Sequence, residues 1–165
     1  MSHDRPWAAH RWLALAARVY LGAIFLLACT HKIARPDLFA VDVATYQLLP
    51  LSAVNLFAIT LPWVELVAAL LLLVGWRVRA AALLVGVMMA AFTVALAWAL
   101  HRGLDMSCGC FASQSAAHDD PISWKTVVRD VAWLALAVYV VAVDHAPLGV
   151  DHWLSRHHRR TDVPA

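Results

Sequence analysis

The chain has 165 residues, of which 62% are hydrophobic and only 15% are charged, and its mean hydropathy is +0.68. Soluble domains are about 45–50% apolar and about 25% charged, so the excess indicates a lipid-facing surface rather than a larger core. The net charge of +2 is too small to predict a nucleic-acid partner. The length suits a single domain.

Four stretches have the length and composition of membrane-spanning helices, which need about 20 apolar residues. Because the runs are continuous rather than alternating, helices are favoured over barrel strands. The sequence therefore predicts an all-α, polytopic four-helix bundle over residues 12–144, between a cytoplasmic N-terminus (1–11) and a cytoplasmic tail (145–165). The four stretches are residues 12–30, 56–75, 80–100 and 124–143.

Residues 36–50, between the first two spans, predict a short amphipathic helix on the outer membrane surface. Two other signals mark helix ends. Gly103 follows the third span as a C′ residue, and Asp120 with Pro121 predicts the N-cap and first position of the fourth helix. In the surface helix, the apolar face is expected to hold Leu38, Val41, Thr45 and Leu48, with Asp37 and Asp42 on other faces.

Lysines and arginines are distributed unevenly between the two sides of the predicted bundle. Seven lie at the termini and in the loop between the second and third helices, against four on the opposite side. The positive-inside rule then places both termini in the cytoplasm and the loop after the third helix in the periplasm, for a protein of the bacterial inner membrane. The seven are Arg5, Arg11, Arg77, Arg79, Arg156, Arg159 and Arg160, and the four are Lys32, Arg35, Arg102 and Lys125.

Leu26-Leu27-Ala28-Cys29 gives a competing interpretation of the N-terminus, because it resembles the cleavage box of a lipoprotein signal. In that case the first helix would be removed and Cys29 would be lipidated. The apolar run is longer than the roughly 7–15 residues of a signal core, and Leu27 fits poorly before the small residue. A membrane-spanning helix is therefore the preferred interpretation.

The most concentrated chemistry in the sequence is Cys108-Gly109-Cys110, in the loop after the third span. Two thiols separated by one residue can form a disulfide if the chain turns tightly, which Gly109 permits. Such a ring is small and strained, and strained, exposed disulfides are the labile ones. The nearby start of the fourth helix would favour a thiolate. The pair predicts thiol–disulfide exchange, with a purely structural bridge as the alternative.

Other cofactor chemistries fit the sequence less well. A zinc site would recruit Cys108, Cys110, His118 and one of His31 or His101, but the spacing matches no common zinc pattern. A haem would need two histidines at membrane depth, whereas His31 and His101 fall at helix ends. The sequence also lacks a glycine-rich nucleotide loop, so we expect neither a metal nor a bound nicotinamide or flavin.

Charged and sulfur-containing residues inside the spans are the remaining candidates. Glu65 lies near the middle of the second helix, where a lone charge is costly, and Lys32 or Arg129 is its expected partner. This group is either a structural ion pair or a proton relay. Arg18 lies nearer the inner interface and can snorkel to it, with a structural role as the preferred interpretation. Cys29 is expected to pack as a small buried residue, with a resolving thiol as the alternative.

Several short motifs along the chain are shared with one family of membrane proteins. They are His31-Lys32, Pro36-Asp37, Phe39, Tyr46-Gln47-Leu48-Leu49-Pro50, Leu61-Pro62-Trp63-Val64-Glu65-Leu66, Arg102-Gly103, Cys108-Gly109-Cys110-Phe111, Ile122-Ser123 and Val128-Arg129-Asp130. In these the chain resembles the methylamine utilisation protein MauE family, within the wider DoxX-like group. The chain departs from the family at Ala112, usually glycine, and at Cys29, usually alanine or glycine.

The resemblance implies a role in maturing a periplasmic enzyme together with a thioredoxin-like partner. Family members are associated with methylamine dehydrogenase, whose small subunit is rich in disulfides, although many relatives occur without that enzyme. With the cysteine pair, this predicts a membrane thiol–disulfide redox protein in which Cys108 and Cys110 react and a quinone accepts the electrons. A non-catalytic assembly factor and a small-molecule carrier centred on Glu65 are the alternatives.

Overall fold

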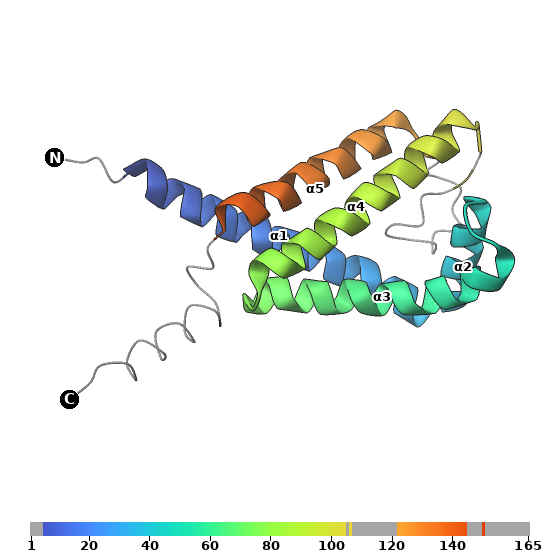
Figure 1. Cartoon of the computed structure of the whole chain (residues 1–165), viewed down its shortest axis with the longest axis horizontal. Helices are drawn as coiled ribbons and strands as arrows, with labels where there is room; N and C mark the ends of the chain where they lie inside the picture. Colours follow the sequence, from blue (N-terminus) through green and yellow to red (C-terminus); the bar gives the residue numbers. More distant parts are fainter. Residues whose placement is uncertain (1–4, 105, 107–121, 145–149, 151–165) are drawn as a thin grey trace.

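The computed structural model describes residues 5–104, 106, 122–144 and 150. The described residues form helices and no strand, which confirms the predicted all-α class. Four of the helices run along the length of the molecule, and a short one lies at one end (Figure 1). They are α1 (Arg5–Ala34), α2 (Pro36–Thr45), α3 (Leu51–Val74), α4 (Val78–His101) and α5 (Trp124–Val143).

In the part of the chain that the structure describes, four helices are long and apolar enough to cross a membrane, with mean hydropathies of 1.9–2.3. They correspond to the four predicted spans. α1 and α4 extend beyond the predicted bounds at both ends, and α3 begins earlier than predicted. Their outward faces carry large apolar side chains, such as Leu56, Val94 and Val138, which are 67%, 69% and 59% exposed. Apolar surface of this kind suits lipid rather than water.

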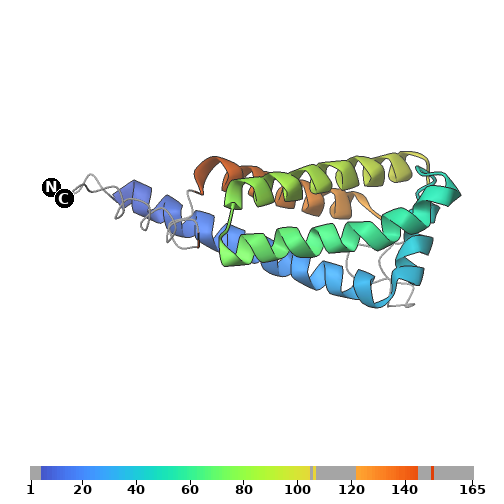
Figure 2. The same cartoon turned by 60° about the horizontal axis from the view of Figure 1, so that its bottom comes forward.

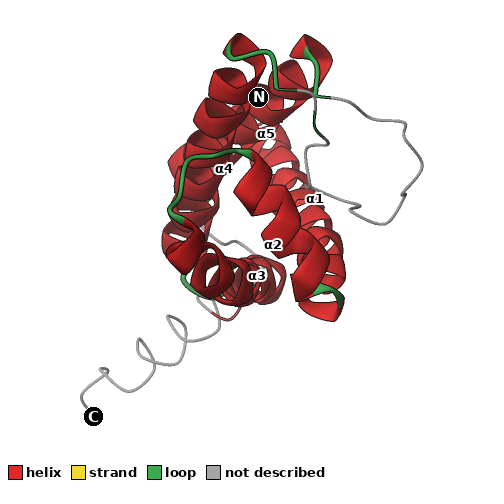
Figure 3. Ribbon diagram, turned by 90° about the vertical axis from the view of Figure 1, so that its right-hand side faces the viewer, coloured by secondary structure: helices red, strands yellow, loops and turns green. Residues whose placement is uncertain are grey.

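The bundle has two ends with different connections, a turn end and a loop end. The turn end holds the tight turn from α3 to α4, visible in Figure 2. There Gly75 adopts a left-handed conformation (φ 75°), and the Trp76 amide donates to the Leu71 carbonyl, as in a Schellman motif. The loop end holds α2, the end of α4 and the start of α5, and α2 lies in front of the bundle when this end faces the viewer (Figure 3).

α1 and α3 approach closely at Gly22. A methyl group built on Gly22 would lie 2.8 Å from Leu73 Cγ and 3.3 Å from the Ala69 carbonyl oxygen. Around this contact Ala68, Ala69 and Leu72 are completely buried. Small residues permit such close packing between membrane helices, where dispersion rather than the hydrophobic effect drives association.

The observed end of α4 and the observed start of α5 can be compared with the capping residues predicted from the sequence. α4 ends at His101, and Gly103 follows in a left-handed conformation (φ 67°), which confirms the predicted C′ glycine. α5 begins at Trp124 with Ser123 at its N-cap, so the prediction that Asp120 and Pro121 start this helix is wrong. Ser123 is itself a favoured N-cap residue type and lies next to the apolar run.

α2 forms as predicted, but it uses a different face. Phe39 and Val43 are buried against Val54 and Ala58 of α3, whereas Val41 is 61% exposed. The predicted apolar face, which includes Val41, was expected to lie on the membrane surface, and the helix packs on the bundle through a second apolar side that the prediction did not name. The segment carries apolar residues on both sides, so its periodicity does not determine which side packs on the bundle.

Candidate functional site

A buried ion pair joins α1 to α3 near the loop end. Lys32, in the last turn of α1, places its Nζ 2.7 and 2.9 Å from the two carboxylate oxygens of Glu65, near the middle of α3. The two side chains are 8% and 9% exposed. Lys32 Nζ also lies 5.0 Å from the centre of the Phe39 ring on α2. Buried charges need such pairing, since an isolated one is costly at this depth.

Arg129, the other candidate partner of Glu65, is engaged differently. Its Nε donates to Asp130 Oδ1 over 3.3 Å, and its guanidinium lies 4.9 Å from the centre of the Trp133 ring. The structure therefore brings Lys32 and Glu65 together and gives Arg129 to the neighbouring carboxylate on α5.

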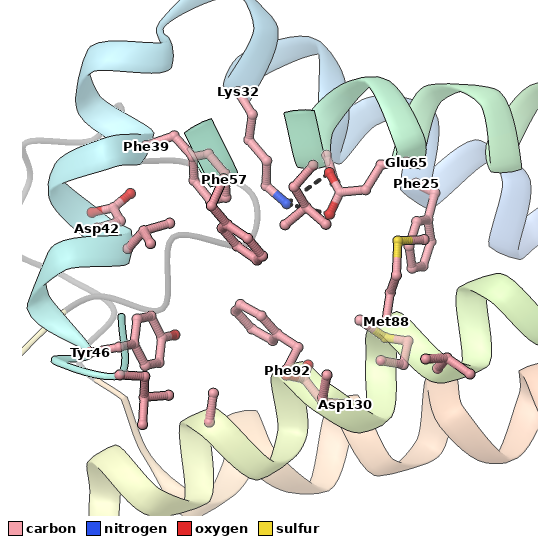
Figure 4. A pocket seen from close by; sticks show the side chains of 18 of the residues that line it. Phe25, Lys32, Phe39, Asp42, Tyr46, Phe57, Glu65, Met88, Phe92 and Asp130 are labelled. Carbon is pink, nitrogen blue, oxygen red and sulfur yellow. Dashed lines mark hydrogen bonds and ion pairs between the residues drawn. The ribbon is translucent and has the colours of Figure 1, made fainter. Parts of the chain in front are cut away.

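The ion pair lines a cavity of about 400 Å³ to which all five helices contribute. Figure 4 shows α2, α3 and α4 around it, with Phe57 and Phe92 projecting toward each other from α3 and α4. Apolar and aromatic side chains make up most of the wall. The aromatic residues are Phe25, Phe39, Tyr46, Phe57, Phe92 and Trp133, and the acidic and basic ones are Lys32, Asp42, Glu65 and Asp130.

Two carboxyl groups in this wall have an unsatisfied oxygen. Oδ2 of Asp42, on α2, and Oδ2 of Asp130, on α5, are buried and have no hydrogen-bond partner among the described residues. Asp130 as a whole is 0% exposed. Burial raises the pKa of Asp42, and the Lys32 charge opposes this shift only in part. Buried polar atoms are normally satisfied, so each free oxygen marks a position where a further donor or acceptor would be stabilised.

Tyr46 lies between these groups, at the end of α2. It is 7% exposed, and its ring meets the Phe92 ring edge-on, with the centroids 6.0 Å apart. Burial raises the pKa of Tyr46, and the charges of Asp130 and Asp42 raise it further. Both carboxyl groups are thus close enough to act on the same phenol. Sequence analysis missed Tyr46, Asp42 and Asp130 as site residues, although Tyr46 and Asp130 stand in the motifs of the family resemblance.

The cysteine pair itself, Cys108 and Cys110, lies outside the described residues, as does His118. The described residues on either side of that segment are tied together, because the Ile122 amide donates to the Met106 carbonyl over 3.0 Å. Met106 and Ile122 also pack against the cluster of Tyr46, Leu96, Ala99 and Val127. The two described ends of the connection therefore lie beside a cluster that includes Tyr46, one of the residues that line the cavity.

Cys29 is completely buried in α1, and its Sγ lies 3.2 Å from the Leu26 carbonyl oxygen. Its burial agrees with the packing role expected of it. A second buried ion pair lies nearer the turn end, where Arg18 Nη1 is 3.4 Å from Asp144 Oδ2 and the side chains are 3% and 0% exposed. This pair agrees with the structural role preferred for Arg18, whose side chain stays within the bundle and does not snorkel.

Four membrane-length helices with buried ion pairs and exposed apolar faces define a multi-pass helical membrane protein. The chain belongs to the methylamine utilisation protein MauE family, whose model matches residues 10–143. It is similar to the methylamine utilization protein MauE of Paracoccus denitrificans, with 31% identity over 126 residues, and to that of Methylophilus methylotrophus, with 34% identity over 133 residues.

These matches cover 76% and 79% of this chain, and 66% and 68% of the respective relatives. The chain therefore spans about two thirds of the length of the curated relatives that it matches. No solved structure matches it.

Proposed function

We propose that this protein is a membrane accessory protein of methylamine utilisation that performs thiol–disulfide exchange through Cys108 and Cys110. In this proposal the loop end faces the periplasm of a bacterial inner membrane, and both termini are cytoplasmic, as the distribution of lysine and arginine favours. The client is a periplasmic enzyme whose maturation needs disulfides, such as methylamine dehydrogenase, and it is reached through a thioredoxin-like partner.

The observation that carries this proposal is the attachment of the cysteine-bearing connection. Its described flanks, Met106 and Ile122, are hydrogen-bonded to each other and packed beside Tyr46, in the wall of the cavity. Family membership supplies the biological setting, since the two curated relatives are named for methylamine utilisation. A redox pair in a connection that starts and ends at the loop end would be able to exchange with a water-soluble partner on one side and a membrane-soluble acceptor on the other.

The proposed reaction has two successive two-electron steps: oxidation of the partner by the disulfide, and reoxidation of the resulting thiols by a quinone. A thiolate of the reduced partner attacks the Cys108–Cys110 disulfide, and a mixed disulfide forms. The partner's second thiolate then displaces the cysteine of this chain, so the partner becomes a disulfide and Cys108 and Cys110 become thiols. A quinone in the bilayer takes the two electrons and two protons, which restores the disulfide and yields a quinol.

A second candidate function is that of a small-molecule carrier. It is favoured by one observation: the Lys32–Glu65 pair lines a cavity and is not enclosed by other side chains on every side. A carrier depends on Glu65 and tolerates loss of the cysteines. A non-catalytic assembly factor depends on neither. The redox protein depends on both thiols.

The test replaces the thiols and follows the client. In a host that needs this protein for methylamine dehydrogenase activity, Cys108→Ser and Cys110→Ser should each abolish that activity while the protein still reaches the membrane, because its helices satisfy their own hydrogen bonds. One of the two single variants should accumulate a mixed disulfide with a thioredoxin-like protein, visible on a non-reducing gel. Cys29→Ser is the matched control and should keep full activity. A double Cys108→Ser, Cys110→Ser variant that still matures the client would exclude redox cycling.

A further inference from the structure

The cavity at the loop end extends to the outside of the bundle between α3 and α4. Phe57 of α3 and Val87 of α4 both line it, and they are 39% and 59% exposed on helices that span the membrane. Ala91, one turn further along α4, is also both exposed and part of the lining. A ligand dissolved in the bilayer can therefore enter sideways without crossing the aqueous phase.

The charges in the cavity exclude an anionic ligand. Both oxygens of Glu65 already hold the Lys32 ammonium, at 2.7 and 2.9 Å, so that cation is occupied. The groups that remain, the carboxyl groups of Asp42 and Asp130, bring no positive charge that would hold a phosphate or a carboxylate. Aromatic and aliphatic side chains form the rest of the wall and favour a flat, apolar ring.

A buried carboxyl group that keeps its proton becomes a hydrogen-bond donor. Asp42 is shifted toward this state, because burial raises its pKa, and its free oxygen has no partner among the described residues. Asp130 shares the geometry: Oδ1 accepts from Arg129, and Oδ2 has no partner among the described residues, so a proton taken up by this carboxyl group would lie on Oδ2. The cavity thus presents two carboxyl groups that donate when they are protonated, on different helices, α2 and α5, with aromatic rings in the space between them (Figure 4).

We infer that this cavity binds the head group of a membrane-soluble quinone, whose two carbonyl oxygens accept hydrogen bonds from the protonated carboxyl groups of Asp42 and Asp130. Its physiological meaning rests on the proposed redox function, but binding itself needs no cysteine. During reduction the quinone takes two electrons from a dithiol, which becomes a disulfide. Each carbonyl oxygen takes the proton of the carboxyl group that it contacts, and the two carboxylates are reprotonated by the protons that the dithiol releases.

Binding is measured with ubiquinone-1 and the full-length protein in lipid nanodiscs. Trp133 lies in the cavity wall, and quinones quench tryptophan emission, so the expected result is saturable quenching. Asp42→Leu and Asp130→Leu should each raise the Kd by about 10-fold, the factor that corresponds to about 1.4 kcal/mol. Asp37→Leu, on the exposed side of the same helix as Asp42, is the matched control and should leave the Kd unchanged.

Two further variants keep the inference falsifiable if a leucine variant folds poorly. Ala91→Trp places a large side chain at an exposed position of the opening and should abolish saturable quenching while the helix content is retained. Asp42→Asn keeps a donor and should change the Kd for ubiquinone-1 less than threefold. A cavity that serves an organic ammonium ion instead would bind n-butylammonium and would lose that affinity in Asp42→Asn, which would overturn the quinone assignment.

The Cys108→Ser, Cys110→Ser variant separates this inference from the proposed function. It should bind ubiquinone-1 with the affinity of the unmodified protein, because the donors lie on α2 and α5. If this variant binds ubiquinone-1 and also still matures the client enzyme, the quinone site stands and the proposed redox function of the cysteines is excluded. Quenching of the unmodified protein that never saturates, or equal Kd values for Asp42→Leu and Asp37→Leu, would overturn the site.

Discussion

Lys32 and Glu65 form a bidentate ion pair, with Nζ 2.7 and 2.9 Å from the two carboxylate oxygens, between the last turn of α1 and the middle of α3. Both side chains are at least nine-tenths buried. The pair holds the two helices together beside the cavity. Both side chains line the cavity, so a bound ligand would contact the ion pair. Removing either member leaves the other as a buried charge, which is far more costly than removing both.

The first prediction compares substitutions of Glu65. Glu65→Gln keeps a hydrogen-bond acceptor for Lys32 and should fold at reduced yield, with a loss of about 3 kcal/mol. Glu65→Lys places a second ammonium beside Lys32 and should abolish the folded protein. The double variant Lys32→Met, Glu65→Leu removes both charges and should be more stable than Glu65→Gln. Fluorescence-detected gel filtration in detergent after heating measures all three. Equal yields for Glu65→Gln and Glu65→Lys would contradict burial of this site.

The second prediction uses two glycines of the spans as a matched pair. Gly22→Ala places a methyl group 2.8 Å from Leu73 Cγ and should destabilise the bundle by about 1–3 kcal/mol, because the cores of proteins tolerate overpacking poorly. Gly86→Ala meets only Ala137 Cβ at 3.8 Å and should be neutral or stabilise by up to about 1 kcal/mol through helix propensity. Thermal denaturation in the same detergent gives both values. A higher Tm for Gly22→Ala than for Gly86→Ala would show that α1 and α3 are further apart.

The third prediction concerns pH and Asp42. Burial raises the pKa of Asp42 in the folded state, so folding binds a proton that the unfolded chain has released. Stability from this group is therefore greatest below its ordinary pKa of about 3.9 and falls as the pH rises through the folded-state value. Asp42→Asn should raise the Tm at pH 7 and leave it nearly unchanged at pH 4.

The control for this pH dependence is Asp37, on the exposed side of the same helix. A hydrogen bond from Arg35 lowers the pKa of Asp37, so its small contribution is present at neutral pH and is lost as the pH falls. Asp37→Asn should therefore lower the Tm at pH 7 slightly or not at all, since exposed pairs contribute little. If Asp42→Asn and Asp37→Asn change the Tm at pH 7 in the same direction and by the same amount, the result would argue against burial of the Asp42 carboxyl group.

The fourth prediction concerns orientation in the membrane. The lysine and arginine distribution places the loop between α4 and α5 outside the cytoplasm. A membrane-impermeant maleimide added to intact, reduced spheroplasts should therefore label Cys108 and Cys110, and Cys29 should stay unlabelled because it is buried in α1. A Cys108→Ser, Cys110→Ser variant is the control. Labelling that appears only after the membrane is broken would reverse the topology.

The four spans were predictable because each is a continuous apolar run of sufficient length, a property that needs no knowledge of its neighbours. The face of α2 was not predictable in the same way. Phe39 and Val43 on one side and Val41 on another are all apolar, so the periodicity allows more than one orientation. Only packing on α3 decides between them.

The polar residues show the same limit. A partner for Glu65 was predictable from its depth, and Lys32 was one of two candidates. The partner of Arg18 was not predictable, because Asp144 lies 126 positions later in the chain and just beyond the last predicted span. Asp42 and Asp130 belong to different helices, α2 and α5, and meet only around the cavity, so neither stood out before the bundle was assembled.

The two ion pairs of α1 give the biogenesis of this protein an order. Lys32 meets its carboxylate 33 positions later, when the next span follows α1 into the bilayer, whereas Arg18 must wait for a residue 126 positions downstream. A nascent chain released after α4 would hold the first pair complete and would still lack the Asp144 carboxylate. Arg18 thus distinguishes a chain that still lacks α5 from one that contains it, because the residue directly after α5 supplies the carboxylate that neutralises a charge of α1.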